Sequence, residues 1–332
     1  MIEVTSRARL HLGLLDNNGE QGRLYGSIGL AVTKPQLVLT AEKADGLTVD
    51  GLEAQRAATY ARRFFRRYGL PEAAYINVKA GIPPHVGLGS GTQLALAVGT
   101  ALARLTGLQL KTPEIAVAVE RGIHSGIGIS TFRYGGFVLD GGHRIQQDVD
   151  PDHADAGRLR QVEKNSVPPL LFRHPMPKDW IFVTVIPSTD QGFSGEAEKV
   201  AFQKLPKAPS SLVEKISRVL LIKMLPALVE KDIENFGRAL TSIQFMVGDC
   251  FASVQGGRFA NPVCEKVVSF LLSKGAAGIG QSSWGPTVYG LVKGRETARS
   301  LAGDVARFLQ GVGGGSTFCG QPHNRGARIR EL

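Results

Sequence analysis

Pro83-Pro84-His85-Val86-Gly87-Leu88-Gly89-Ser90-Gly91-Thr92 is the stretch that decides the fold of this 332-residue chain. Its alternating glycines precede an apolar run at 93–105, which predicts a buried helix that ends at Gly107. Glycines at such a turn let the backbone approach a phosphate, and the helix start adds N–H donors and the positive end of its dipole. We therefore predict a phosphate-binding loop made of Gly87, Leu88, Gly89, Ser90, Gly91 and Thr92. A tight strand-to-helix connection with no ligand is the alternative.

The spacing of this loop excludes two common phosphate-binding patterns. A Walker loop has Lys followed by Ser or Thr after its last glycine, and no lysine follows Gly91 here. A dinucleotide-binding turn needs a different glycine spacing. The loop therefore belongs to neither class.

Outward from the loop, strands alternate with helices in the first half. Residues 2–14 alternate in polarity, and a strong turn signal, Asp16-Asn17-Asn18-Gly19, follows them. We expect further strands at 26–32, 37–42 and 74–80, and helices at 53–68 and 113–121. A short strand is expected at 136–140, inside the glycine-rich stretch 122–142.

The second half follows a polar segment at 148–169, which is expected to link two domains. We expect strands at 180–186 and 287–292, the latter entered by a Gly-Ile-Gly turn at 278–280. Helices are expected at 195–203, 211–230 with an interruption at Pro226, 233–247, 262–274 and 295–309, before a glycine-rich, basic tail at 311–332. This order predicts an α+β protein with domains at 1–165 and 166–332.

Composition narrows the class of protein. Hydrophobic residues make up 43% and charged residues 20%, as in ordinary globular chains, and no run reaches the roughly 18 apolar residues of a membrane span. The start of the sequence does not have the pattern of an export signal, so we expect a cytoplasmic protein without membrane partners. Three cysteines at wide spacing predict reduced thiols rather than disulfides or a metal pair.

The net charge of +10 suits an anionic partner. The basic residues are scattered, and the densest group is expected to form a solvated helix face: Arg62, Arg63, Arg66 and Arg67. Because no basic stripe with interleaved aromatic residues is present, we expect a small anionic substrate and no nucleic acid.

Three motifs resemble those of the GHMP kinases. The loop has the pattern Pro-x-x-x-Gly-Leu-Gly-Ser, while Arg7-Ala8-Arg9-Leu10-His11-Leu12-Gly13 and Gly278-Ile279-Gly280-Gln281-Ser282-Ser283-Trp284-Gly285-Pro286-Thr287 stand where that family has its first and third motifs. The resemblance implies an N-terminal β-α-β domain with a left-handed crossover and a C-terminal ferredoxin-like α/β sandwich. It also implies a magnesium ion held by Ser90 and Glu120, although Glu120 could equally be an exposed helix end.

The sequence departs from the kinases at the residue that activates the acceptor. Residues 124–132 contain no carboxylate where a kinase has an Asp, the next one is Asp140, and Gly91 replaces the second serine of the loop. Together with Ser194-Gly195-Glu196-Ala197-Glu198 and the stretch 135–142, the motifs resemble the beta-ribofuranosylaminobenzene 5'-phosphate synthase family over most of the chain. That family condenses phosphoribosyl pyrophosphate with 4-aminobenzoate or 4-hydroxybenzoate in methanopterin biosynthesis, releasing carbon dioxide and pyrophosphate.

The resemblance implies roles for residues near the motifs. Arg9, His11 and His124 are candidate catalytic groups; His11 and His124 could transfer protons or serve as structural residues. Trp284 could equally stack on the arene or pack against the sheet, and Ser282 belongs to the substrate-binding motif. The candidates for holding the arene carboxylate are Arg7, Arg9, His11, Arg23 and Arg133, each of which could instead form a surface ion pair.

Three alternatives stay open from sequence. The synthase is the leading hypothesis, an ATP-dependent kinase on the same fold is the second, and a catalytically silent RNA-binding protein is the third. A kinase would gain support if Asp140 pointed at the loop. A homodimer is expected only because two-fold assemblies are frequent among enzymes of this kind.

Overall fold

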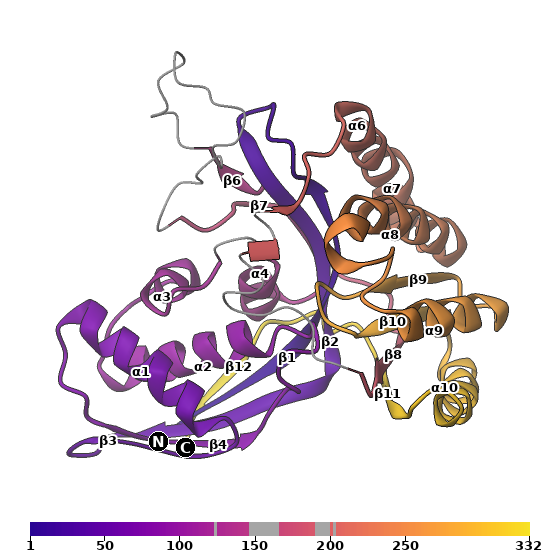
Figure 1. Ribbon diagram of the computed structural model, residues 1–332. Coiled ribbons are helices and arrows are strands. Elements are labelled where there is room, and N and C mark those ends of the chain that lie inside the picture. The colour runs from indigo at the N-terminus through magenta and orange to yellow at the C-terminus, as the bar shows by residue number, and fades with distance from the viewer. Residues whose placement is uncertain (123–124, 146–165, 190–199, 202–203) are drawn as a thin grey trace.

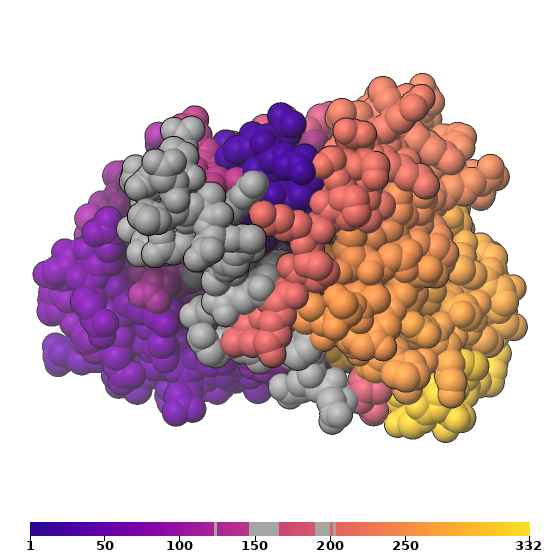
Figure 2. All heavy atoms as spheres, turned by 45° about the horizontal axis from the view of Figure 1, so that its top comes forward, coloured from indigo at the N-terminus to yellow at the C-terminus, as the bar shows by residue number. Residues whose placement is uncertain are grey.

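The computed structural model describes residues 1–122, 125–145, 166–189, 200–201 and 204–332. The chain forms two β-sheets with helices packed against them (Figure 1). Seen from another side, the two halves of the chain form lobes that lie side by side (Figure 2). The predicted α+β architecture is confirmed. Among the described residues, no helix combines the length and apolar character that crossing a bilayer requires.

The first sheet is built on two long strands. β1 (Ile2–Asp16) buries alternate side chains and pairs antiparallel with β2 (Arg23–Glu42). The strands expected at 26–32 and 37–42 are one continuous strand, β2, whose pairing with β1 is interrupted by a register shift between Arg7 and Arg9, opposite residues 32–35. The sheet order is β12-β1-β2-β4-β3, β5 and β6 also pair with β2, and β7 pairs with β5.

A βαβ unit closes the outer edge of this sheet. β3 (Leu47–Gly51), a strand that sequence reasoning missed, runs parallel to β4 (Ala74–Ala80), and α1 (Ala54–Tyr68) connects them. α1 buries an apolar face that includes Phe64 and Phe65. The β-α-β unit implied by the resemblance is present, and the hand of its crossover stays a prediction.

The helix after the glycine loop lies at the centre of the first domain. α2 (Ser90–Leu105) buries almost its whole length against β1 and β2, as the apolar run predicted. α3 (Thr112–Ala118) follows, shorter than expected at its C-terminus. α4 (Ile127–Tyr134) was missed because Gly126 and Gly135 flank it, and a glycine-rich stretch was interpreted as irregular. β5 (Phe137–Asp140) matches the predicted short strand, and β6 (His143–Arg144) pairs with β2.

The second sheet has the strand order β11-β8-β10-β9, entirely antiparallel. Its strands are β8 (Trp180–Pro187), β9 (Gly278–Gln281), β10 (Val288–Lys293) and β11 (Gly315–Gly320). In chain order this is the 4-1-3-2 arrangement of a ferredoxin-like sandwich. The expected turn at 278–280 is wrong, because these residues pair with β10 as a strand whose glycines admit α8 closely.

Helices of the second half include α8 (Ile233–Gln255), which extends well past the predicted end and packs on both β9 and β1. The stretch 210–230 is continuous helix rather than interrupted at Pro226: α6 (Ser210–Val219), a π-helical turn η2 (Leu220–Met224) and α7 (Leu225–Glu230). α9 (Pro262–Ser273) and α10 (Arg295–Gln310) match their predictions. The predicted linker at 148–169 and helix at 195–203 fall largely outside the described residues.

Two strands from beyond residue 165 complete the first sheet. β7 (Leu170–His174) pairs with β5, and β12 (Arg328–Glu331) pairs with β1. The glycine-rich, basic tail at 311–332 is thus partly strand. The division at 165 stays a prediction, but it does not coincide with the division between the two sheets.

Candidate active site

The glycine loop is held by the third motif of the second domain. Gly87 has φ +91° and Gly89 has φ +77°, values that favour glycine. A Cβ at Gly87 would lie 2.1 Å from the Ser282 carbonyl oxygen, so only glycine fits there. Leu88 is buried beneath the loop. The glycines therefore serve close packing against residues 282–285 as well as the approach of a ligand.

Ser282 joins all three motifs through one hydroxyl. Its Oγ donates to the Gly87 carbonyl at 2.7 Å and accepts from the His11 backbone N–H at 3.0 Å. Its side chain is fully buried. Ser282 is therefore a positioning group between β1 and the loop, and the structure places it beneath the site rather than among the residues that line it.

Arg9 and His11 extend from β1 toward the loop. The Arg9 Nη1 donates to the Gly87 carbonyl at 2.5 Å, and its backbone N–H donates to the Leu88 carbonyl at 3.1 Å. Burial, and secondarily the charge of Arg9, lower the pKa of His11 to about 3. The imidazole is therefore neutral at neutral pH, so it can exchange hydrogen bonds but cannot supply a positive charge to a carboxylate.

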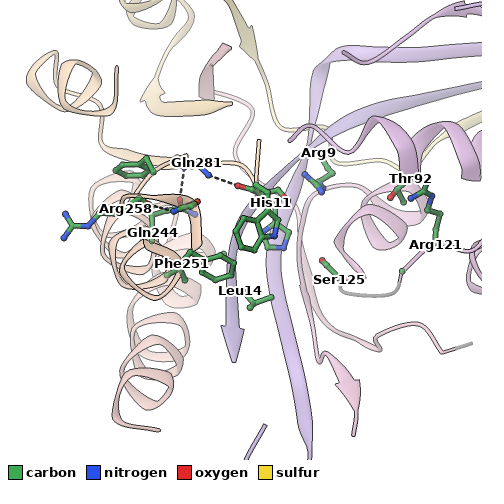
Figure 3. A pocket seen from close by; sticks show the side chains of 18 of the residues that line it. Arg9, His11, Leu14, Thr92, Arg121, Ser125, Gln244, Phe251, Arg258 and Gln281 are labelled. Atoms are coloured by element: carbon green, nitrogen blue, oxygen red, sulfur yellow. Dashed lines mark hydrogen bonds between the residues drawn. The ribbon is translucent and has the colours of Figure 1, made fainter. Parts of the chain in front are cut away.

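One cavity of about 270 Å³ lies between the two sheets. Figure 3 shows Arg121, Thr92 and Ser125 at one end, Arg9, His11 and Leu14 in the middle, and Gln244, Phe251 and Arg258 at the other. We name these the loop end and the aromatic end. The remaining lining residues are Gly13, Glu120, Gly122, Val247, Gly248, Gln255, Phe259, Gln281, Ser283 and Trp284.

The aromatic end is built mainly from α8. The rings of Phe251 and Trp284 lie 4.6 Å apart at 58° and form an apolar wall. Gln244 donates to the Leu12 carbonyl at 2.6 Å and accepts from the Gln281 backbone N–H at 2.8 Å. These bonds fix α8 to both β1 and β9, so the wall has a defined position relative to the loop.

At the loop end, three residues that sequence reasoning missed surround Gly91. A Cβ on Gly91 would lie 2.8 Å from Arg56 Nη2, 3.4 Å from Arg121 Nη2 and 3.5 Å from the Tyr60 hydroxyl. Arg56 and Tyr60 are four residues apart on α1, so they share a helix face. That spacing was the available signal, but it does not reveal that the face meets the loop.

Asp140 supports the loop end from behind. Its two carboxylate oxygens accept from the backbone N–H groups of Gly126 and Gly142, both at 2.9 Å. Complete burial raises the pKa of Asp140 to about 7 against the opposing effect of these hydrogen bonds. The side chain therefore anchors the start of α4, next to Ser125, instead of pointing at the glycine loop.

Comparison with known proteins agrees with this geometry. The profile of the GHMP kinases N terminal domain matches residues 54–136, and that of the GHMP kinases C terminal domain matches residues 224–311. A homoserine kinase structure from Cytophaga hutchinsonii superposes with a TM-score of 0.64 at 17% identity, covering 99% of this chain and 97% of that one. At this identity the superposition shows the shared fold alone.

Sequence relatives decide the family. The beta-ribofuranosylphenol 5'-phosphate synthase of Methanothermobacter thermautotrophicus is 35% identical over 98% of this chain and 97% of its own length. The same-named protein of Archaeoglobus fulgidus is 35% identical over 93% of this chain and 92% of its own. The chain belongs to the beta-ribofuranosylphenol 5'-phosphate synthase family. It is an enzyme of the pentosyltransferase type, and the kinase alternative is the weaker one.

Within this synthase family member, the structure separates the predicted site residues. Arg9, His11, Thr92 and Trp284 line the cavity, and Ser90 begins α2 beside it. Three predicted arginines bind backbone or surface groups and are not among the lining residues. Arg7 contacts Thr33 and Gln36, Arg23 donates to the carbonyls of Gly141 and Gly142, and Arg133 stacks on Tyr134. His124 lies outside the described residues.

The implied magnesium site has one carboxylate. Glu120 lines the cavity, yet its side chain is 62% exposed and its Oε2 lies 3.2 Å from Arg63 Nη2. No group of three or more His, Cys, Asp or Glu side chains able to hold a metal occurs in the part of the chain that the structure describes. This donor set fits a magnesium ion that arrives with substrate phosphates, since such ions need only one or two protein carboxylates.

Proposed function

We propose that this chain transfers the phosphoribosyl group of phosphoribosyl pyrophosphate to the carboxyl-bearing carbon of 4-hydroxybenzoate or 4-aminobenzoate, in methanopterin biosynthesis. The products are the C-riboside 5'-phosphate, carbon dioxide and pyrophosphate. The name of the relatives contains a phenol, which supports 4-hydroxybenzoate as the acceptor. A cytoplasmic setting accords with these small, charged substrates.

One observation carries the proposal: a single cavity has a phosphate loop at one end and an aromatic wall at the other. The cationic Arg121 faces the loop end, while Phe251 and Trp284 form the wall. A donor with phosphates and a flat aromatic acceptor need these two environments at once. A kinase for a small aliphatic alcohol has no comparable need of the wall.

The reaction balances without an external acid or base. The bond from the anomeric carbon to pyrophosphate breaks, and its electron pair leaves with the pyrophosphate oxygen. The ring carbon supplies the electrons of the new carbon–carbon bond. The bond to the carboxylate then breaks, and its electron pair restores the aromatic ring as carbon dioxide departs. A neutral His11 is consistent with this sequence, because no proton has to move through it.

The residues in the middle of the cavity orient the reacting groups. Arg9, the lining arginine nearest to the middle of the cavity, holds the arene carboxylate until it leaves. His11 lies beside Arg9 and forms one hydrogen bond, as donor or acceptor, with the sugar or the carboxylate. The apolar wall excludes water from the anomeric carbon, so hydrolysis does not compete with the arene.

Ser90 and Glu120 would hold a magnesium ion together with the substrate phosphates, and this ion would neutralise charge on the leaving pyrophosphate. The chain itself contributes the N–H groups of the first turn of α2, because the first intrahelical bond runs from Gln93 to the Gly89 carbonyl. These donors are fixed before the reaction and therefore favour the charge that develops on the leaving group.

The test is release of labelled carbon dioxide from carboxyl-labelled 4-hydroxybenzoate or 4-aminobenzoate with phosphoribosyl pyrophosphate and magnesium. We expect release that requires both substrates and falls at least about 10-fold in Ser90→Ala. The matched control is Ser273→Ala, a serine at the exposed end of α9. Absence of release with either benzoate, together with ATP turnover on a small alcohol, would establish the kinase instead.

The quaternary structure is a separate proposal. A homodimer follows from the frequency of two-fold assemblies among enzymes. Sedimentation at micromolar concentration tests it, and a single species at 35.5 kDa would contradict it.

A further inference from the structure

Three side chains form a corner beside the first turn of α2, which we call the arginine corner: Arg56, Tyr60 and Arg121. The Arg121 guanidinium lies 4.9 Å from the centre of the Tyr60 ring, and its Nη2 donates to the Tyr60 hydroxyl. Arg56 Nη2 and Arg121 Nη2 both lie close to Gly91, in the first turn of α2. Two guanidinium groups thus lie against a helix start that has no acidic residue in its first turn.

The positive charge of this corner is only partly compensated. Arg56 pairs with Glu53 at 2.6 Å, and Glu120 pairs with Arg63 at 3.2 Å. Among the described residues, no carboxylate forms an ion pair with Arg121. Its Nε is buried without a hydrogen-bond partner, so no acceptor of the described chain offsets the charge at that atom.

We propose that the arginine corner receives the leaving pyrophosphate, with Arg121 as its principal ligand and Tyr60 as the positioning residue that holds Arg121. This inference rests on the proposed function for the identity of the anion. It makes the corner the part of the site that selects a donor with a phosphoanhydride group.

The two ends of the cavity determine which phosphate lies there. An arene on the wall of Phe251 and Trp284 attacks the anomeric carbon from the aromatic end. The leaving oxygen is then displaced from the opposite face of that carbon, toward Arg121 at the loop end. The 5'-phosphate, attached to another carbon of the ribose, is not on this line. The electron pair of the broken bond goes to a pyrophosphate oxygen, whose charge the guanidiniums offset without a proton.

This assignment explains how a kinase fold works without an acceptor-activating carboxylate. Sugar transfer of this type depends on stabilising a departing anion, since the arene needs no deprotonation. Fixed guanidiniums in a partly buried corner meet that requirement. The corner therefore assists the reaction at the leaving group, by stabilising its charge, whereas a kinase assists it at the nucleophile, by activating the acceptor with a carboxylate.

The experiment measures binding of inorganic pyrophosphate to the full-length chain by calorimetry, with and without magnesium. We expect the dissociation constant to rise at least about 10-fold in Arg121→Gln, with partial recovery in Arg121→Lys. Arg62→Gln is the matched control, because Arg62 lies on α1 in an exposed pair with Glu72 and should leave binding unchanged. Ribose 5-phosphate, as a second probe, should bind all variants alike.

Tyr60→Phe distinguishes positioning from general stability. It should weaken pyrophosphate binding in the wild-type background and add little in Arg121→Gln, since the two groups act as one unit. Unchanged pyrophosphate binding in Arg121→Gln, or a loss confined to ribose 5-phosphate, would overturn the assignment. The carbon dioxide assay on the wild type separates this from the proposed function: absence of release rejects the synthase, whereas release with intact pyrophosphate binding in Arg121→Gln rejects only the corner.

Discussion

The two ends of the cavity are built in different ways. The loop end depends on backbone: glycines at positive φ, the amides of a helix start, and carbonyls that Arg9 and Ser282 bind. The aromatic end depends on side chains of α8 and one tryptophan, held by ordinary helix packing. A backbone site tolerates almost no change of residue type, while a side-chain site can be resized by single substitutions. This contrast predicts where mutation abolishes activity and where it alters specificity.

The largest effect is expected at Gly87, because the loop end depends on the backbone conformation of this residue. Gly87→Ala places a Cβ 2.1 Å from the Ser282 carbonyl, so the loop must move away from the third motif. We expect a loss of about 3–5 kcal/mol in the free energy of unfolding and at least about 100-fold in activity. Gly107→Ala is the control, since Gly107 has φ +75° but open space, and should cost about 1–2 kcal/mol. Equal losses in the two variants would show that the clash is unimportant.

Next in size is a pH effect confined to the loop end. The folded-state pKa of Asp140, about 7, lies above its ordinary 3.8, so its contribution to stability is complete below pH 3.8 and is lost as pH rises toward 7. In urea unfolding, the free energy of unfolding of the wild type should therefore fall by up to about 4 kcal/mol, relative to that of Asp140→Asn, between pH 4 and pH 8. The exposed Asp179→Asn provides the control. A difference that stays constant with pH would mean that Asp140 is ionised throughout.

A smaller, selective effect is expected at the aromatic end. Phe251→Leu removes the ring that faces Trp284 and should raise the KM for the benzoate about 10-fold, leaving the KM for phosphoribosyl pyrophosphate within about 2-fold. Phe245→Leu, on the same helix but outside the lining, serves as the control. Should both substrates weaken together in Phe251→Leu, the division of the cavity into two ends would be untenable.

The smallest effect is expected in the middle of the cavity. Because the pKa of His11 is lowered to about 3, its charge does not change between pH 5 and pH 8. His11→Gln should remove roughly one hydrogen bond and so raise the activation free energy by about 1 kcal/mol. The shape of the pH–rate profile should stay unaltered. If the wild-type pH–rate profile had an inflection near pH 6.5 that disappeared in the variant, His11 would have a proton-transfer role after all.

The same contrast explains what could be predicted from sequence. The loop and the first and third motifs could be recognised in the sequence, because glycine spacing reflects backbone geometry, but their contact through Ser282 was not predicted. Arg56, Tyr60 and Phe251 were not, because their spacing is that of any amphipathic helix and nothing local says which face meets the cavity. Arg7, Arg23 and Arg133 were chosen for proximity to motifs, but a bulge in β1 separates Arg7 from Arg9, Arg23 begins β2 and Arg133 lies on α4. Proximity in sequence therefore does not bring these side chains to the cavity.

Fold predictions followed a similar division. Elements with strong periodicity, such as α1 and β1, were correct within a few residues. Glycine misled twice: α4 lies between Gly126 and Gly135, and the turn expected at 278–280 is a strand. Gly128 inside α4 packs against Thr92, and the glycines of β9 pack against α8, so glycine within these elements allows close packing instead of ending them. Local sequence cannot distinguish these two uses.

The pairing of β12 with β1 has a consequence for synthesis of the chain. β1 is synthesised long before residues 328–331, its partner at the sheet edge, because the whole second sheet lies between them in the chain. The backbone bonds of Thr33 with Gln321 and of Gly136 with His323 belong to the same late segment. The first sheet therefore cannot be completed before β12 has been synthesised, and β1 keeps one edge uncovered until then. A chaperone that shields exposed strand edges would act during that interval.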